Sequence, residues 1–262
     1  MATLSFQNEY ARVEINSDGG YVTAWDVIDS SEQWHSMLYK GETIKRTGIP
    51  LLFPYAGPLE NDLFIHSGQV MPQHGFARLV PWHISSELEK SAGLEMNLHS
   101  STLSDEWKKA YPYEFEARIK VSISNTGGLI YTLSVTNLGT TNLPIALGLH
   151  PYFSLPHDEK HTITISSEPS FDAEQINWNT WQDFLLFPLN HTVAVNWKNG
   201  GITIQATGEM KNLVLWSGEG AEEKPYICIE PISAPFNAIN SNPIWVKPNT
   251  KWSTTIQFEA LR

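Results

Sequence analysis

Four separated stretches of the sequence hold residues that could transfer protons or bind an anionic group. Arg46 lies just before a glycine–proline loop in KRTGIPLLFPYAGPLEND, and His74 and Arg78 lie four residues apart in PQHGFARLVPW. His150 lies in GLHPYFSLP, and Glu230 lies in YICIEPISAPFNAIN. Imidazole and carboxylate groups are common general acids and bases, and a guanidinium presents a fork of donors to anionic oxygens. These residue types suit acid–base chemistry on a small polar ligand, provided that the fold brings them together.

The local sequence around these residues favours functional positions for several of them. Glu230 follows a short apolar strand, Tyr226–Ile229, where partial desolvation would raise its pKa and make it a usable base near neutral pH. His150 follows the alternating segment PIALGL and so falls at the end of a strand, where loops often carry catalytic groups. In an extended chain, the even separation of His74 and Arg78 places both side chains on one face. Taken singly, each residue also has an ordinary structural interpretation, such as a surface arginine or a salt-bridged glutamate.

The elements that must position these residues are mainly β-strands. Apolar residues alternate with polar ones from Tyr113 to Ile123, and the alternation resumes from Leu129 to Val135 after the turn sequence NTGG. This pattern predicts a long antiparallel hairpin with one face exposed to water. The same alternation recurs at residues 94–98, 202–204 and 252–258. A helix is indicated only in the short stretch LSDEWKKAY.

The composition is that of one large β-rich domain. The chain has 262 residues, of which 41% are hydrophobic and 17% are charged, and it contains ten tryptophans. It has no Pro/Ser linker, charge block or fixed repeat, so we expect residues 1–262 to form a single all-β domain, a large antiparallel β-sandwich. A concave sheet face can stack aromatic rings against a sugar. We expect most of the tryptophans to be core residues and a few to line that face.

Charge and cysteine content narrow the classes of partner. A formal net charge of −11 argues against nucleic acid or an anionic membrane, although two or three local arginines could still bind a small anion. Cys228 is the only cysteine, so no intrachain disulfide and no thiolate metal cluster is expected. No basic start followed by a long apolar run is present at the N-terminus, and no segment has 18 uninterrupted apolar residues. We therefore expect a soluble, cytoplasmic protein.

Several motifs, in a fixed order, resemble those of one known superfamily. The segments GIPLLFPYAGPL, HGFAR, GLHPYF and CIEP resemble the aldose 1-epimerase (galactose mutarotase) superfamily, in particular its aldose 1-epimerase-like and hexose-6-phosphate 1-epimerase branch. The resemblance extends to EYARVEINSDGGYVTAWDV, NLVLWSG and VKPNTKWSTTIQFE, and so covers nearly the whole chain. It implies a galactose mutarotase-like supersandwich with an open sugar-binding groove.

The resemblance also implies roles for individual residues. It assigns a catalytic glutamate, a catalytic histidine, a second histidine that assists the substrate, two arginines in the groove and one aromatic residue near the site. In that order these are Glu230, His150, His74, Arg46 with Arg78, and Trp216. Such an enzyme interconverts the α and β anomers of a sugar by opening and closing its ring, with a carboxylate base and an imidazolium acid. The reaction needs no metal, nucleotide or other cofactor.

The substrate implied by the resemblance is a hexose or a hexose 6-phosphate. In the sugar-phosphate branch the two arginines help to hold phosphate, and a phosphate group needs two convergent cations. The chain differs from that branch at Arg46-Thr47-Gly48, where two glycines usually follow the arginine, and from other relatives at Gly57-Pro58, where many have Gly-Arg. For the family aspartate that contacts sugar hydroxyls, Asp172 and Asp183 are both candidates. The sequence does not indicate an oligomeric state.

Three other classes of function compete with a mutarotase. A catalytically silent carbohydrate-binding or sensing sandwich is the main alternative, but binding alone needs no acid–base pair. A glycoside hydrolase would need two carboxylates about 5–10 Å apart, and the motifs offer one convincing carboxylate. A metal-dependent activity is disfavoured because His150 and His157 have neither i+2 nor i+4 spacing.

Overall fold

The computed structural model describes residues 3–88, 93–168, 171–218 and 224–261, and within them it consists mainly of antiparallel β-strands. The four-stranded sheet has the order β1-β2-β3-β4, with bounds Thr3–Gln7, Ala11–Asn16, Tyr21–Ile28 and Trp34–Ser36. The eight-stranded sheet has the order β15-β17-β18-β22-β11-β10-β9-β8. Its strands are, in that order, Thr164–Ile165, Val193–Trp197, Gly200–Ala206, Lys251–Leu261, Leu129–Asn137, Phe115–Ile123, Gly93–His99 and His83–Leu88.

The remaining strands form a six-stranded sheet and two short pairs. The six-stranded sheet has the order β16-β19-β20-β13-β5, with bounds Phe184–Pro188, Asn212–Trp216, Tyr226–Ile232, Gly148–Leu149 and Leu51–Leu52. Its sixth strand, β14 (Tyr152–Ser154), also pairs with β20. The short pairs are β6 (Leu63–Phe64) with β7 (Gln69–Val70), and β12 (Leu143–Ile145) with β21 (Ile244–Val246).

The predicted hairpin is confirmed as β10 and β11. These strands pair in an antiparallel register in which Ile119 lies opposite Leu133. Along β10 the alternate residues from Phe115 to Ile123 are buried, and the residues between them are exposed or half-buried. Because successive side chains in a strand point to opposite faces, this pattern gives one face to the core and one to water.

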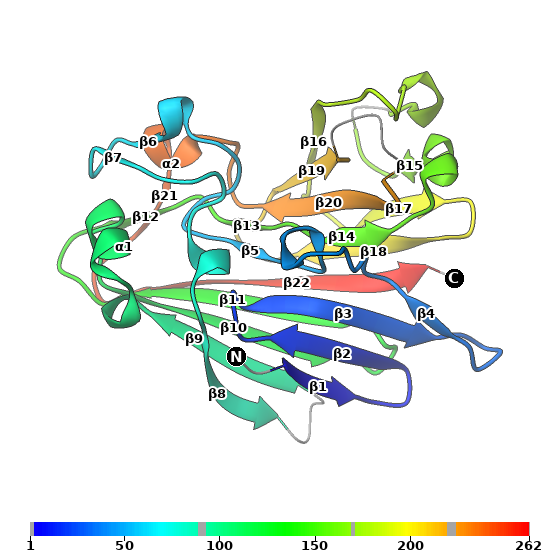
Figure 1. Ribbon diagram of the computed structural model, residues 1–262, viewed down its shortest axis with the longest axis horizontal. Helices are drawn as coiled ribbons and strands as arrows, with labels where there is room; N and C mark the ends of the chain where they lie inside the picture. Colours follow the sequence, from blue (N-terminus) through cyan, green and yellow to red (C-terminus); the bar gives the residue numbers. More distant parts are fainter. Residues whose placement is uncertain (1–2, 89–92, 169–170, 219–223, 262) are drawn as a thin grey trace.

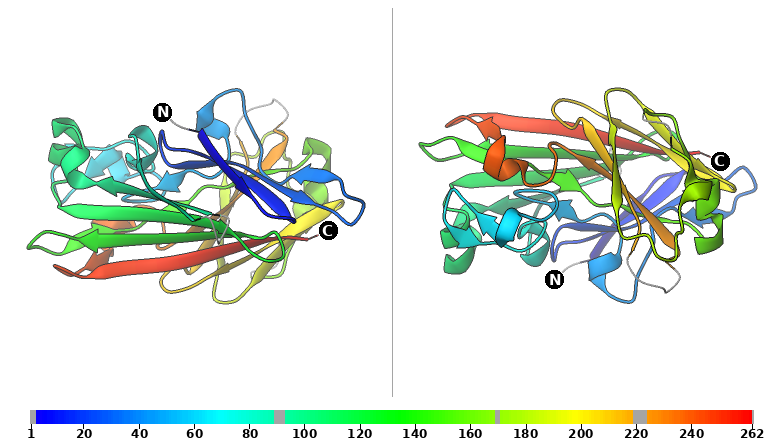
Figure 2. Two further views of the ribbon diagram at one scale, coloured as in Figure 1. Left: turned by 90° about the horizontal axis from the view of Figure 1, so that it is seen from below. Right: turned by 90° about the horizontal axis from the view of Figure 1, so that it is seen from above.

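The eight-stranded and six-stranded sheets pack face to face and enclose the core. In Figure 1, β22, β11, β10 and β9 run lengthwise below β20, β13 and β5, and Figure 2 shows the same layers from below and above. Aromatic contacts join the layers: Phe153 of β14 meets Phe258 of β22 at 5.9 Å between ring centroids, and Phe53 meets Phe115 at 5.0 Å. The predicted all-β sandwich is therefore confirmed.

Helices are short and lie between the strands. They are α1 (Asp105–Ala110), α2 (Ala238–Ser241) and the 3₁₀ turns η1 (Ile44–Arg46), η2 (Glu60–Asp62), η3 (Ala77–Leu79), η5 (Ser100–Thr102), η6 (His157–Thr162) and η7 (Ala173–Gln175). The predicted helix in LSDEWKKAY is α1, which Ser104 caps by accepting a hydrogen bond from the Trp107 backbone N–H. Within the described residues, no helix has the length and apolar character needed to cross a bilayer.

Candidate active site

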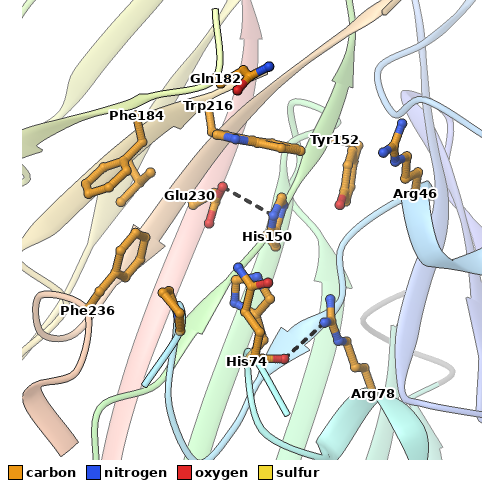
Figure 3. Close-up of a pocket in the computed structure, with 13 residues that line it drawn as sticks. Arg46, His74, Arg78, His150, Tyr152, Gln182, Phe184, Trp216, Glu230 and Phe236 are labelled. Carbon is orange, nitrogen blue, oxygen red and sulfur yellow. Dashed lines mark hydrogen bonds and ion pairs between the residues drawn. The ribbon is translucent and has the colours of Figure 1, made fainter. Parts of the chain in front are cut away.

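All six residues singled out from the sequence line one groove, whose volume is about 380 Å³ (Figure 3). They are Arg46, His74, Arg78, His150, Trp216 and Glu230. They come from segments far apart in the chain, because β14, β16, β19 and β20 of the six-stranded sheet, the link between β13 and β14, and the segments around η1 and η3 meet at this groove. The fold therefore brings together the residue types needed for acid–base chemistry.

The centre of the groove is a pair formed by His150 and Glu230. The two side chains are only 6% and 3% exposed, and His150 Nε2 lies 3.3 Å from Glu230 Oε1. Their strands explain the contact, since Gly148 pairs with Ile232 and Tyr152 pairs with Cys228 in the antiparallel register. His150 and Glu230 are the residues at the middle of this alignment and so face each other across the sheet.

The burial of this pair changes the acidity of both groups. Burial raises the pKa of Glu230 well above its ordinary range, although the nearby Arg78 charge opposes this effect. Burial, together with the smaller effect of the Arg78 charge, lowers the pKa of His150 to about 3. Both directions favour an uncharged pair over an ion pair, with a single proton held by Glu230. Moving that proton to His150 creates the carboxylate and imidazolium without changing the net charge of the pair.

The pair retains unused hydrogen-bonding capacity. In the described part of the structure, His150 Nδ1 and Glu230 Oε2 are buried and have no hydrogen-bond partner. A buried polar atom without a partner is unfavourable, and a ligand hydroxyl in the groove would relieve this cost. These two atoms are thus available to hydrogen-bond a polar ligand in the groove.

Three rings fix the orientation of the His150 imidazole. Tyr152 stacks on it with centroids 4.6 Å apart and planes 10° from parallel. Trp216 and His74 meet it edge-on, at 5.7 Å and 5.4 Å. With one face stacked and two edges contacted, the ring has little freedom to turn away from Glu230.

His74 is held as a neutral hydrogen-bond donor. Its Nδ1 accepts a hydrogen bond from the Gly57 N–H at 2.9 Å, and its own backbone N–H donates to the Gly57 carbonyl at 2.9 Å. Burial lowers the pKa of His74 well below its ordinary value, and the His150 and Arg78 groups act in the same direction. With Nδ1 used as an acceptor, the ring proton is on Nε2, which can donate to a ligand oxygen.

The structural reason that we gave for His74 and Arg78 converging was wrong. We expected an extended segment with both side chains on one face, but His74 has a positive φ of 70° and Arg78 lies in the 3₁₀ turn η3. The two side chains reach the groove from a tight turn instead. Arg78 is fixed there by donating through Nη2 to the Gln73 carbonyl at 3.1 Å.

The expected position of Glu230 also needs a correction. We placed it just after the strand Tyr226–Ile229, whereas it lies within β20, which continues to Ile232 and is buried along its whole length. The glutamate is therefore almost completely buried, although it still lines the groove, rather than only partly desolvated. The predicted direction of its pKa change is confirmed, and the burial that causes it is greater than we expected.

The two aspartates left open by the sequence do not line the groove. Asp172 caps η7, accepting from the Glu174 N–H at 3.1 Å and the Gln175 side chain at 2.8 Å. Asp183 accepts from the Phe184 N–H at 2.8 Å. The neighbouring residue Gln182 lines the groove in their place.

Several groove residues were missed by the sequence reasoning. Tyr152, Gln73, Gln182, Phe184 and Phe236 all line the groove. Tyr152 and Gln73 lie inside or beside the motifs quoted above, two residues after His150 and one residue before His74, and so had a signal. The aromatic pair of Phe184 and Phe236, with centroids 4.7 Å apart, joins β16 to the loop after β20. Phe236 falls within the quoted stretch YICIEPISAPFNAIN, but nothing in the composition or spacing of that stretch marks it as a groove residue.

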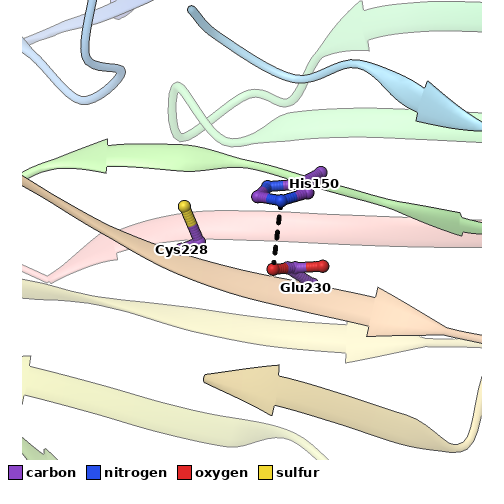
Figure 4. A group of neighbouring side chains, drawn as sticks. All are labelled: His150, Cys228 and Glu230. Atoms are coloured by element: carbon purple, nitrogen blue, oxygen red, sulfur yellow. Dashed lines mark ion pairs between the residues drawn. The ribbon is translucent and has the colours of Figure 1, made fainter. Parts of the chain in front are cut away.

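One group of side chains in the described residues could approach a metal ion. His150, Cys228 and Glu230 each offer a ligand atom, and these atoms lie within 4.8 Å of one another (Figure 4). A metal would need Cys228 as a thiolate, but burial and the neighbouring Glu230 raise the pKa of this thiol well above its ordinary value. The group therefore favours proton transfer over metal binding as the structure presents it. His157, the other histidine considered, bonds Asn179 instead.

A β-sandwich with a buried imidazole–carboxyl pair at the centre of an aromatic-lined groove can bind a small ligand that has both apolar and polar faces. The sequence profile of one family, described as aldose 1-epimerase, matches residues 2–259. The chain therefore belongs to the aldose 1-epimerase family, and the resemblance seen in the motifs is confirmed.

Individual relatives support this assignment. The chain is 29% identical over 163 residues to the plasmid-encoded protein LacX of Lactococcus lactis subsp. lactis, covering 59% of this chain and 51% of LacX, so the match spans about half the length of that relative. It is 23% identical over 286 residues to a Cenchrus ciliaris protein named "Putative glucose-6-phosphate 1-epimerase", covering 95% of this chain and 81% of that protein. The crystal structure of Slr1438 from Synechocystis sp. PCC 6803 superposes with a TM-score of 0.85 at 29% identity, covering 99% of this chain and 96% of Slr1438.

Proposed function

We propose that this protein is a mutarotase that interconverts the α and β anomers of a hexose 6-phosphate. The observation that carries the proposal is the Glu230–His150 pair, buried at the centre of the groove with 3.3 Å between Nε2 and Oε1. Membership of the aldose 1-epimerase family supports the reaction class. The choice of a phosphorylated sugar rests on the two arginines of the groove.

Opening the sugar ring needs one proton to be removed from the C1 hydroxyl and one to be given to the ring oxygen. Sugar hydroxyls that donate to Glu230 stabilise its carboxylate, so the shared proton moves to His150. Glu230 then removes the proton from the C1 hydroxyl, and His150 gives its proton to the ring oxygen. The C1–O5 bond breaks and C1 becomes an aldehyde. After rotation about C1–C2, the two transfers run in reverse on the other face of the aldehyde, and both residues return to their starting states.

The positions of the other groove residues fit this sequence of steps. His74, neutral and with its proton on Nε2, can donate to a sugar oxygen on which charge develops. Trp216 and the Phe184–Phe236 pair offer rings for the apolar C–H faces of the sugar. Gln73 and Gln182 supply amide groups for the hydroxyls.

The arrangement of the arginines supports a phosphate at C6. In a pyranose, C6 lies on the side of the ring oxygen, and His150 is the group assigned to that oxygen. Arg46 lies beyond Tyr152, on the side of His150 that faces away from Glu230, and Arg78 lies below the imidazole in this view (Figure 3). Phe184 and Phe236 lie on the other side of the groove, beyond Glu230. A sugar bound with its ring oxygen at His150 would direct C6 and its phosphate toward the two guanidinium groups.

Magnetisation-transfer NMR of anomer exchange tests the proposal. Wild-type protein is added to glucose, galactose and glucose 6-phosphate at equal concentration, and the α-to-β exchange rate of each is compared with the buffer rate. We expect the largest acceleration for glucose 6-phosphate. A larger acceleration of the free sugars would assign an aldose 1-epimerase without phosphate preference. Binding of all three without acceleration would assign the catalytically silent alternative.

A further inference from the structure

One lysine is completely buried although the proposed reaction does not use it. Lys160, in η6, is 0% exposed and is among the largest fully buried side chains in the described residues. Removing an ammonium group from water is costly unless it is paired or hydrogen-bonded. We therefore asked which groups the buried ammonium of Lys160 contacts.

The Lys160 ammonium has a set of three close contacts. Nζ donates to Ser217 Oγ at 2.7 Å, and it lies 5.8 Å from the centre of the Tyr226 ring and 5.9 Å from that of Trp178. Both distances are within the range of cation–π attraction. The group is thus held between η6, the end of β19, the start of β20 and the loop after η7.

Two of these contacts lead directly to rings that orient His150. Ser217 directly follows Trp216, which meets the imidazole edge-on at 5.7 Å. Tyr226 packs on Tyr152 with centroids 5.2 Å apart, and Tyr152 stacks on the imidazole at 4.6 Å. Two of the three rings around His150 are therefore each linked to the same ammonium group through one intervening residue, Trp216 through Ser217 and Tyr152 through Tyr226.

The third contact leads to another part of the groove. Trp178 meets Trp181 with centroids 5.2 Å apart, and Trp181 directly precedes the groove residue Gln182. Lys160 thus connects the segment carrying Gln182 with the strands carrying Trp216 and Glu230. A side chain without directed donors could fill the space but could not hold these segments in one relative position.

We propose that Lys160 is a positioning residue that holds Trp216 and Tyr152 against the His150 imidazole. The proposal rests on the function proposed above for the Glu230–His150 pair. Burial also lowers the pKa of Lys160 to about 8, with the neighbouring Lys224 acting in the same direction and Cys228 opposing it. The residue therefore remains mostly charged at neutral pH, where its donors and charge serve these contacts.

Lys160→Met separates this role from a merely structural one. Methionine keeps the length of the apolar stem and removes the buried charge, so the thermal midpoint should stay the same or rise. We expect kcat for glucose 6-phosphate to fall about 10- to 100-fold, with KM changed less than about threefold, because His150 loses its fixed orientation. A structural role predicts the reverse, a lower midpoint with unchanged kcat for the folded fraction. Lys198→Met, the same change at an exposed lysine, is the matched control and should alter neither quantity.

A second readout does not depend on catalysis. In protein labelled with ¹³C at histidine Cε1, the His150 resonance is identified by its loss in His150→Gln, and its shift reports the ring currents of Trp216 and Tyr152. We expect this resonance to move in Lys160→Met and in Ser217→Ala, which keeps the lysine but removes its acceptor. The proposal is overturned if the resonance stays in place in both variants, or if folded Lys160→Met keeps the wild-type kcat. Wild-type protein that accelerates no sugar would instead overturn the proposed function, while the resonance still decides the positioning role.

Discussion

The Nε2 atom of His150 lies 3.3 Å from Oε1 of Glu230, and the antiparallel pairing of β20 with β13 and β14 aligns the two residues. Because both side chains are buried, each changes the cost of charging the other. The contact between His150 and Glu230 therefore links the stability of the protein to its proposed chemistry.

Arg46 and Arg78 should contribute differently to substrate binding and to catalysis. Arg46→Ala removes a cation at one end of the groove, so KM for glucose 6-phosphate should rise about 10- to 100-fold while that for glucose is unchanged. Arg78→Ala should also raise KM for glucose 6-phosphate, and in addition it should reduce kcat for both sugars, because the Arg78 charge favours the Glu230 carboxylate. Steady-state kinetics on the two substrates measure this difference. Equal effects of Arg46→Ala on both sugars would contradict the assignment of the phosphate end.

The turn that carries His74 should not tolerate a side chain at Gly75. This glycine has a φ of 68°, and a Cβ there would collide with the Phe53 carbonyl oxygen. Gly75→Ala should therefore cost more than about 2 kcal/mol of stability and displace His74 from the groove. Gly68→Ala is the control, since Gly68 has a φ of 67° but nothing lies within 4 Å of its added Cβ. We expect it to cost only about 1 kcal/mol in chemical denaturation, with full activity. Equal costs at the two positions would contradict the collision.

The stability of the protein should depend on pH through Glu230. Burial raises the pKa of this carboxyl above its ordinary value of 4.5, so the folded protein holds the proton more tightly than the unfolded chain does. The resulting contribution to the free energy of unfolding is complete below pH 4.5 and is lost as the pH rises through the folded-state pKa. Glu230→Gln has no such loss. Its thermal midpoint should rise relative to that of wild type as the pH increases above 4.5, and a difference that stays constant with pH would contradict the raised pKa.

Lys160 should give a dependence of the opposite sign at higher pH. Its pKa is lowered from 10.5 to about 8, so in this interval the unfolded chain binds more protons than the folded protein. Wild-type protein should therefore gain stability relative to Lys160→Met as the pH rises above about 8. Urea unfolding of the two proteins on either side of that value measures the gain. If the difference in the free energy of unfolding between the two proteins is the same on both sides of that value, the lowered pKa of Lys160 is contradicted.

Much of the fold could be predicted because it depends on local patterns. The β10–β11 hairpin follows from the alternation in YEFEARIKVSIS and the NTGG turn, and α1 follows from the capping serine of LSDEWKKAY. The membership of the groove followed from the family motifs, since each of the six residues lies in or near one. The reasoning from local geometry was less reliable, because the tight turn at His74 and the continuation of β20 through Pro231 depend on tertiary contacts.

The rest of the site could not be predicted because it depends on contacts between distant segments. Phe184 of β16 and Phe236 of the loop after β20 are far apart in sequence, and although Phe236 falls within YICIEPISAPFNAIN, nothing in that stretch marks it as a groove residue. Lys160 looks like an ordinary surface lysine in HDEKHT, and only the packing of η6 on Ser217, Tyr226 and Trp178 buries it. Periodicity carries no information about such pairings.

Anomer exchange of glucose 6-phosphate by wild type and Glu230→Gln, followed by magnetisation-transfer NMR, tests the central claim most directly. Glutamine keeps the size and burial of the side chain but cannot accept the C1 proton, so the exchange rate should fall about 10²- to 10⁴-fold. Sugar binding, measured by calorimetry, should persist in the variant. A variant that exchanges anomers as fast as wild type would contradict the Glu230–His150 mechanism, as would a wild type that binds the sugar without accelerating its exchange.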